Sequence, residues 1–270
     1  MTHANPPIRM ALYGATGRMG HGLIRAIHDS TDYRLVAAIA SPGSPVLGSD
    51  AGTSAGLPSP LGLALTSHVA EGLDEADVAI DFSIAGAVES HLAACAAAGV
   101  GLVIGTTGLS AQTLIAVEEA SLRIPVLVAA NTSLGINLLA QLIEKTAALL
   151  PKDYDIEIFE AHHRYKVDAP SGTALQLGSA AARGRGETLE AVDMDRRGAR
   201  AAGSIGFSVL RGGDIVGEHT VYFAGPGERI EITHRAHDRM TFAYGALRAA
   251  AWLAGRPPGR YTMADVLELG

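Results

Sequence analysis

Short apolar runs alternate with helical patterns along the first half of the chain, and this alternation limits the fold more than any other feature. Residues 8–14, 34–40, 77–83, 101–107 and 125–131 read as buried strands. Helical patterns separate several of them, at 18–29, 87–98 and 111–122. Continuous apolar strands separated by helices are typical of parallel strands covered on both faces. We therefore expect an α/β fold with a doubly wound parallel sheet.

The pattern changes after Asn131. The elements predicted from there on are helices over 133–150, near 171 and over 240–255, and strands over 155–163, 204–212, 215–225 and 228–236. The last three strands follow one another without helices, which indicates an antiparallel or mixed open sheet. We therefore expect a second, α+β domain over 132–239, and a first domain made of 1–131 and 240–270. An exposed loop is expected over 183–203, where charges of both signs gather.

The composition excludes several classes of protein. A net charge of −7, from 21 Lys+Arg and 28 Asp+Glu, argues against nucleic acid or an anionic membrane as a partner. No apolar stretch approaches the roughly 20 residues of a membrane span, and no signal peptide is visible, so the cytoplasm is the expected location. Cys95 is the only cysteine and lies in an Ala-rich run, which indicates a small buried core residue.

A glycine turn follows the first predicted strand. LYGATGRMGHG places Gly14, Gly17 and Gly20 between that strand and a helix, with Thr16 where the commonest dinucleotide fingerprint has glycine. The first glycine permits a tight turn, the second lets the backbone approach a pyrophosphate, and the third lets the helix pack closely. The N–H groups at the helix start then face the anion. This pattern predicts a Rossmann-like dinucleotide site, and the alternative is a tight turn without a ligand.

Two further strand ends belong to the same surface, because ligands of open α/β sheets bind beyond the carboxyl ends of the strands. Gly105-Thr106-Thr107 and Ala129-Ala130-Asn131 end the fourth and fifth predicted strands. Their small residues leave room for a flat ring and offer backbone carbonyls to a carboxamide. The alternative is that each is an ordinary loop.

A basic cluster stands in the second half, in EAHHRYKVDAPSGTAL at 160–175. His162, His163 and Lys166 lie close in sequence, and Ser171 is placed to cap the next helix. Lys166, an imidazole and a helix N-terminus together suit a carboxylate, so two such anchors suit a small dicarboxylate. Histidine and lysine also exchange protons near neutral pH. The alternative is a solvated basic loop.

We expect no metal at this cluster. Neighbouring side chains of a strand point to opposite faces, so His162 and His163 do not easily bind one ion. We also find no cysteine or carboxylate at a familiar ligand spacing there.

EAHHRYKVDAPSGTAL resembles the signature of the 4-hydroxy-tetrahydrodipicolinate reductase (dihydrodipicolinate reductase) family of the diaminopimelate–lysine pathway. The similarity extends over nearly the whole chain, through GATGRMG, LGSDAG, IGTTG, AANTSLGIN, GDIVGEHTV, RIEITHRA and RMTFAYGALRAAAWL. The resemblance implies an oxidoreductase that uses NADPH or NADH to reduce a cyclic imine with two carboxylates. It also implies a homotetramer assembled through the second domain, and a last helix and tail that rejoin the first domain.

The resemblance assigns roles to individual residues. It places the proton donor/acceptor on His162 and a second proton donor on Lys166. Substrate carboxylate contacts fall on His163, Gly172 and Thr173. Nucleotide contacts fall on Gly14, Ala15, Thr16, Gly17, Arg18, Met19, Gly105, Thr106, Thr107, Ala129, Ala130, Asn131 and Thr132.

The end of the second predicted strand departs from the family pattern. Members place an acidic residue there for the ribose, often beside an arginine, but this chain has Ala40 and Ser41. Neither side chain repels a 2′-phosphate, and Arg18 is a nearby cation. We therefore expect use of both NADPH and NADH.

Two other functions compete with the reductase. One is another two-domain nicotinamide dehydrogenase, acting on an amino acid or a semialdehyde, against which the long central motif argues. The other is a nucleotide sensor without turnover, against which the complete set of His162, Lys166, Gly172 and Thr173 argues.

Overall fold

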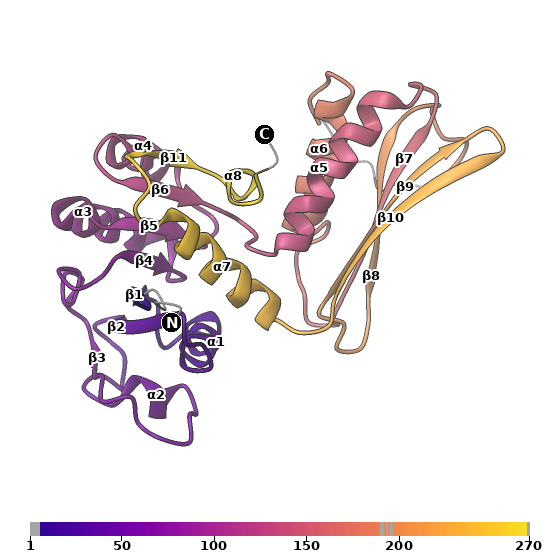
Figure 1. Cartoon of the computed structure of the whole chain (residues 1–270). Helices are drawn as coiled ribbons and strands as arrows, with labels where there is room; N and C mark the ends of the chain where they lie inside the picture. Colours follow the sequence, from indigo (N-terminus) through magenta and orange to yellow (C-terminus); the bar gives the residue numbers. More distant parts are fainter. Residues whose placement is uncertain (1–5, 190–191, 193, 195–196, 269–270) are drawn as a thin grey trace, which may run out of the picture. The chain divides into compact units, whose positions relative to one another are not determined.

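The structure is a computed structural model that describes residues 6–189, 192, 194 and 197–268. Within these residues the chain divides into two compact units (Figure 1). The first runs to Ser133 and resumes over 242–268, and the second spans Leu134–Thr241. The units thus divide after residues 133 and 241, whereas the sequence predicts domain boundaries after residues 131 and 239.

Within the described residues, the first unit holds a seven-stranded sheet in the order β11-β6-β5-β4-β1-β2-β3. The strands are β1 (Ile8–Tyr13), β2 (Tyr33–Ile39), β3 (Leu65–Thr66), β4 (Val78–Asp81), β5 (Gly101–Ile104), β6 (Pro125–Val128) and β11 (Gly259–Tyr261). All neighbouring pairs are parallel. From β3 to β6 the order is the common dinucleotide-binding one, with its switch point between β1 and β4. The predicted doubly wound sheet is therefore confirmed.

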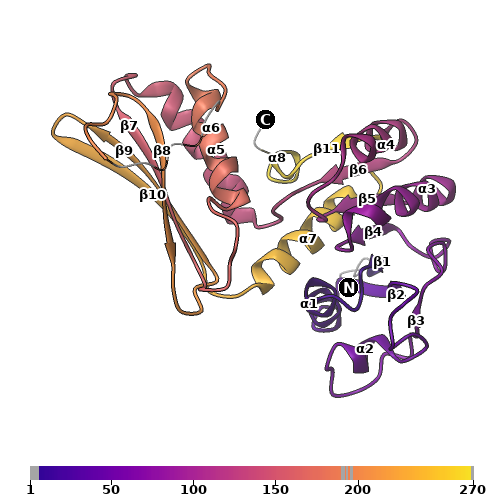
Figure 2. The ribbon, with the colours of Figure 1, turned by 180° about the vertical axis from the view of Figure 1, so that it is seen from behind.

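Helices cover both faces of this sheet. Figures 1 and 2 show α3 (Val88–Ala98) and α4 (Ala111–Ser121) on one face, and α1 (Arg18–His28) and α7 (Met240–Leu253) on the other. Under α3 and α4 lies a buried core that includes Leu92, Cys95 and Val117. Cys95 is fully buried, as expected for a small core residue. The chain also forms the short helices α2 (Ala51–Ser54), η1 (Ala85–Ala87) and α8 (Met263–Val266).

The register of the parallel strands aligns their carboxyl ends. Thr66 pairs with Ile39, Ile39 with Tyr13, Tyr13 with Asp81, Asp81 with Ile104, and Ile104 with Val128. The residue that follows each strand therefore emerges at one edge of the sheet. Because this edge includes the switch point, it is where such sheets bind ligands.

The described part of the second unit forms a four-stranded sheet in the order β10-β9-β7-β8. Its strands are β7 (Asp155–His162), β8 (Ile205–Arg211), β9 (Gly217–Gly225) and β10 (Glu228–Ala236). Only β7 and β8 run parallel among these pairs, so the predicted mixed sheet is confirmed. In both views α5 (Leu134–Leu149) and α6 (Gly172–Gly184) lie on one face of it (Figures 1 and 2). Their apolar sides pack on the alternate residues of β7, such as Ile156 and Ile158.

Several predicted limits are wrong, and the errors at three strand ends have one physical cause. The strands predicted to end at 83, 107 and 131 end at Asp81, Ile104 and Val128. The small and apolar residues that follow read like strand, but they line the edge of the sheet. The predicted loop over 183–203 begins inside α6, and its residues 190–191, 193 and 195–196 lie outside the described residues.

Across the described residues, no helix combines the length and the apolar character that crossing a membrane requires.

Candidate active site

A cavity of about 500 Å³ lies at the aligned strand ends of the first unit. Residues that follow three neighbouring strands line it, among them Gly14, Ala40 and Phe82, together with Thr16 and Gly17 of the turn. Apolar surface dominates the lining, and His91 of α3 adds an ionisable ring. An apolar pocket with a few convergent polar groups is the form that cofactor sites take.

The glycine turn leaves no room for side chains. Gly14 has φ +76°, and a Cβ there would lie 2.4 Å from the carbonyl oxygen of Phe82. A Cβ at Gly20 would lie 2.2 Å from the carbonyl oxygen of Gly14, so the first turn of α1 packs directly on the loop. Gly17 caps α1 with an extended backbone and lines the cavity. The residues therefore fit a dinucleotide, because Gly17 places the start of α1, whose first N–H groups lack helical partners, beside the cavity.

The other predicted nucleotide contacts lie at the same edge of the sheet but do not line this cavity. Gly105 packs under the Phe82 ring, since a Cβ there would lie 2.3 Å from that ring. Thr106 donates a 2.9 Å hydrogen bond to Asp81, and Thr132 donates a 2.7 Å bond to the backbone of Phe242 at the start of α7. Ala15 and Ala129 are buried, Met19 and Asn131 are half-buried, and Arg18, Thr107 and Ala130 are exposed.

A buried polar network under the cavity was not predicted. Asp81 lies 2.7 Å from His91 Nδ1 and accepts a 2.8 Å bond from the Ser83 N–H. Burial raises the pKa of the Asp81 carboxyl, but hydrogen bonds from His91 and Ser83 outweigh it and lower the pKa below the ordinary value. Tyr13 stacks on the His91 ring at 3.9 Å. The network thus holds His91 at the cavity wall. In the sequence, two features could have indicated it: an acid at the end of a strand and a single histidine in an Ala-rich helix.

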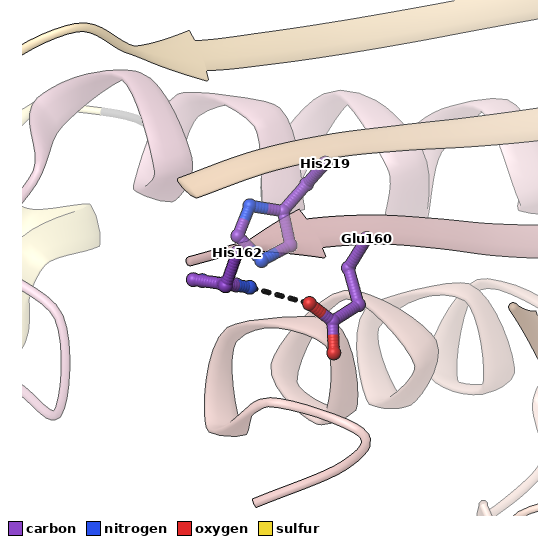
Figure 3. Close-up of side chains that lie close together, drawn as sticks. All are labelled: Glu160, His162 and His219. Atoms are coloured by element: carbon purple, nitrogen blue, oxygen red, sulfur yellow. Dashed lines mark hydrogen bonds and ion pairs between the residues drawn. The ribbon is translucent and has the colours of Figure 1, made fainter. Parts of the chain in front are cut away.

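A second polar cluster lies in the second unit, at the end of β7. Alternation along β7 places Glu160 and His162 on the face that carries Ile156 and Ile158, so apolar packing gives way to polar groups there. His162 Nδ1 is hydrogen-bonded to Glu160 Oε2 (Figure 3). Arg211 of β8, which pairs with His162 in register, donates bonds of 2.9 and 2.8 Å to the two Glu160 oxygens.

Glu160 is fully buried and stays ionised. Burial raises the pKa of its carboxyl, but hydrogen bonds from His162 and Arg211 outweigh burial and lower the pKa to about 2. His219 of β9 pairs with Glu160 in register and lies edge-on to His162, with ring centroids 5.2 Å apart. Burial, and next the nearby His162, lower the pKa of His219 to about 3. The cluster therefore combines a buried carboxylate with a neutral imidazole beside His162.

Glu160, His162 and His219 also lie at a spacing from which metal ligands can converge, within 4.8 Å of one another (Figure 3). The sequence argument against a metal considered only neighbouring histidines and missed this grouping. Arg211 nevertheless binds both oxygens of Glu160. A dication would have to displace that guanidinium, so the donor set fits proton exchange better than a metal.

The loop after β7 carries two more of the predicted site residues, Lys166 and His163. Lys166 Nζ lies 2.8 Å from the Asp168 carboxylate, and the Asp168 carbonyl accepts a 2.6 Å bond from Arg211. Contacts thus run from Lys166 through Asp168, Arg211 and Glu160 to His162. Arg239 reaches toward the ring of His163 at 3.5 Å.

The Pro-Ser-Gly-Thr turn starts α6 as predicted. Ser171 is the N-cap, with its Oγ accepting a 3.1 Å bond from Ala174. Gly172 and Thr173 form the first turn, where helix N–H groups are available to an anion. A Cβ at Gly172 would meet nothing within 4 Å, so there is open space beside it.

Comparison with known proteins shows which family of proteins carries these two sites. A family model described as dihydrodipicolinate reductase, N-terminus, matches residues 8–132, and one described as dihydrodipicolinate reductase, C-terminus, matches residues 135–267. The chain belongs to the dihydrodipicolinate reductase family. The two models meet between 132 and 135, next to the limit of the two units at 133.

Individual relatives cover the whole chain. It is 50% identical over 267 residues to the 4-hydroxy-tetrahydrodipicolinate reductase of Afipia carboxidovorans, which covers 97% of this chain and 98% of the relative. It is 52% identical over 265 residues to the enzyme of the same name from Alkalilimnicola ehrlichii, with 97% and 99% covered. A dipicolinate-bound dihydrodipicolinate reductase from Paenisporosarcina has the same fold, with TM-score 0.73, 24% identity, and 96% and 98% of the chains covered.

Proposed function

We propose that this chain is an NAD(P)H-dependent 4-hydroxy-tetrahydrodipicolinate reductase. It reduces its substrate, by way of dihydrodipicolinate, to tetrahydrodipicolinate for diaminopimelate and lysine biosynthesis. The observation that carries the proposal is the polar cluster of the second unit, where His162 and Lys166 are linked through Glu160 and Arg211 beside the start of α6. The dicarboxylate in the names of the relatives is the anion that this cluster suits.

The first unit is proposed to hold the cofactor at the strand-end cavity. Gly14 and Gly17 leave room for the pyrophosphate, and the start of α1 offers it N–H groups. Gly105–Thr107 and Ala129–Thr132 are proposed to hold the nicotinamide end. When bound, the reduced nicotinamide supplies the hydride.

The proposed use of both NADPH and NADH rests on the end of β2. Ala40 and Ser41 line the cavity there, and neither repels a 2′-phosphate nor holds a ribose as a carboxylate does. Arg18 is exposed at the first position of α1 and is proposed to contact the 2′-phosphate.

The second unit is proposed to bind the substrate. The N–H groups of Gly172 and Thr173 bind one carboxylate, and His163 contributes to the binding. Adding a hydride to a conjugated imine pushes electron density onto nitrogen or its tautomeric carbon. The reduction takes up one hydride and one proton. The Lys166 ammonium stabilises the density and donates that proton, while His162 takes a proton from one substrate atom and returns it to another without net change. A homotetramer formed by the second unit and a cytoplasmic location belong to the same proposal.

Absorbance of the reduced cofactor tests this function. A coupled synthase supplies the unstable substrate, and NADPH or NADH is offered at equal concentration. We expect substrate-dependent oxidation with both. Cofactor binding without oxidation would favour a nucleotide sensor, and oxidation only with an amino acid or a semialdehyde would favour another dehydrogenase.

A further inference from the structure

The contact between His162 Nδ1 and Glu160 decides which ring nitrogen faces the substrate. An ionised carboxylate only accepts hydrogen bonds, so the nitrogen that touches it carries the proton. Glu160 is kept ionised by two bonds from Arg211, at 2.8 and 2.9 Å, and by the Ser171 N–H at 3.1 Å. His162 therefore has its proton on Nδ1, and in the neutral ring the lone pair is on Nε2.

Nε2 lies beside a glycine. A Cβ added at Gly217 would lie 3.1 Å from Nε2 and 3.4 Å from Cδ2 of His162. Within the residues that the structure describes, Nε2 has no hydrogen-bond partner, and it is not sealed off from solvent. The glycine thus leaves space at the one ring nitrogen that still has hydrogen-bonding capacity.

We propose that Glu160, held in place by Arg211, is a positioning residue that fixes His162 as the Nδ1–H tautomer and makes Nε2 the atom that exchanges the proton with the substrate. This rests on the proposed reductase function. A proton accepted at Nε2 leaves an imidazolium whose charge Glu160 balances, and the same N–H returns the proton. Glu160 itself stays ionised, as the carboxylate of a Ser-His-Asp triad does.

The groups around His162 set the expected outcome of each change. Glu160 faces it from its own strand, Arg211 from β8 and His219 from β9, while Lys166 lies in the following loop and His234 opposes His219 on β10. Removing the carboxylate takes away the acceptor that only the Nδ1–H form satisfies, so this tautomer loses its preference. Removing Arg211 leaves the acceptor in place, so the tautomer should persist.

Nitrogen-15 NMR of histidine-labelled protein tests this without turnover. The His162 signals are assigned by their loss in His162→Asn. In the unmodified protein we expect a protonated Nδ1 and an unprotonated Nε2. In Glu160→Gln the share of the Nδ1–H tautomer should fall, and in Arg211→Met that tautomer should persist. Glu157→Gln, a change to an acid of the same strand that pairs with Arg200, should leave it unchanged.

Kinetics complete the test. Glu160→Gln should lower kcat about 10²- to 10⁴-fold with little change in KM, in step with its loss of the Nδ1–H tautomer. An Nε2–H tautomer in the unmodified protein, or an unchanged tautomer in Glu160→Gln, would overturn the inference while the reductase function stands. If the unmodified protein shows the expected tautomer but no turnover, the proposed function fails instead.

Discussion

The backbone N–H of Ser171 donates a 3.1 Å hydrogen bond to Glu160, eleven positions earlier in the chain. The same serine caps α6 through its side chain. One residue thus joins the start of the helix proposed to bind the substrate carboxylate to the carboxylate that holds His162. The proposed substrate binding and proton exchange therefore depend on the same corner of the second unit, and several consequences can be measured.

Lys166 and His163 should separate in their kinetic effects. Lys166→Ala removes a cation and a proton source from the transition state, so kcat should fall roughly 10²- to 10⁴-fold. His163→Ala should mainly raise KM, because it weakens substrate binding. Steady-state kinetics check both, with Lys145→Ala on the exposed side of α5 as the matched control. Near-normal kcat in Lys166→Ala would refute its role.

Gly17→Val should abolish cofactor binding and leave the fold intact. The φ of Gly17 is −78°, which any residue adopts, and a Cβ there would lie 3.3 Å from the Gly14 carbonyl oxygen. The rest of the side chain would occupy the space proposed for the pyrophosphate. Titration calorimetry with reduced cofactor measures the effect, and circular dichroism checks the fold. Unchanged affinity would mean that the turn does not bind the nucleotide.

Arg18→Ala should weaken the binding of NADPH more than the binding of NADH. One charge-assisted hydrogen bond contributes about 1.5–3 kcal/mol, and about 1.4 kcal/mol is tenfold in affinity. We therefore expect kcat/KM values for the two cofactors within about two orders of magnitude in the unmodified protein, and closer together in the variant. Equal losses with both cofactors would assign Arg18 to the pyrophosphate or to the helix start.

His219 should make the fold less stable in acid. Burial is the main reason that its pKa falls from 6.5 to about 3, so between these values the unfolded chain binds a proton that the folded one does not. The free energy of unfolding then drops by about 1.4 kcal/mol per pH unit as the pH falls below 6.5.

His219→Gln should flatten this dependence between pH 6.5 and about 4.5, where the separate contribution of Glu160 begins. Urea unfolding at a series of pH values measures the slope, with His28→Gln at the end of α1 as the control. Parallel slopes for His219→Gln and the unmodified protein would contradict a neutral buried imidazole.

The sequence predicted the sheet types and the main helices because each rests on a long apolar period. It missed β3, β11, α2 and α8, which have two to four residues each and are too short to show an apolar period. The two predicted sites, the glycine turn and the basic cluster, could be found because each is formed by residues that are close together in the sequence.

The supporting residues could not be found in the same way. Arg211 and His219 reach Glu160 only through the register of β8 and β9, which no local pattern encodes. Glu160 itself was detectable, because period-two alternation in IEIFEAHH puts an acid and His162 on the apolar face. An acid two residues before a histidine, on the apolar face of a predicted strand, thus indicates a buried carboxylate–histidine pair.

Transfer of deuterium from the cofactor tests the central claim most directly. Reduced nicotinamide cofactor carrying deuterium at the hydride position is turned over with synthase-generated substrate, and the product is weighed by mass spectrometry. The reductase predicts tetrahydrodipicolinate that is one mass unit heavier, formed in proportion to the cofactor oxidised. Oxidised cofactor without deuterium in that product, or no oxidation at all, would contradict it.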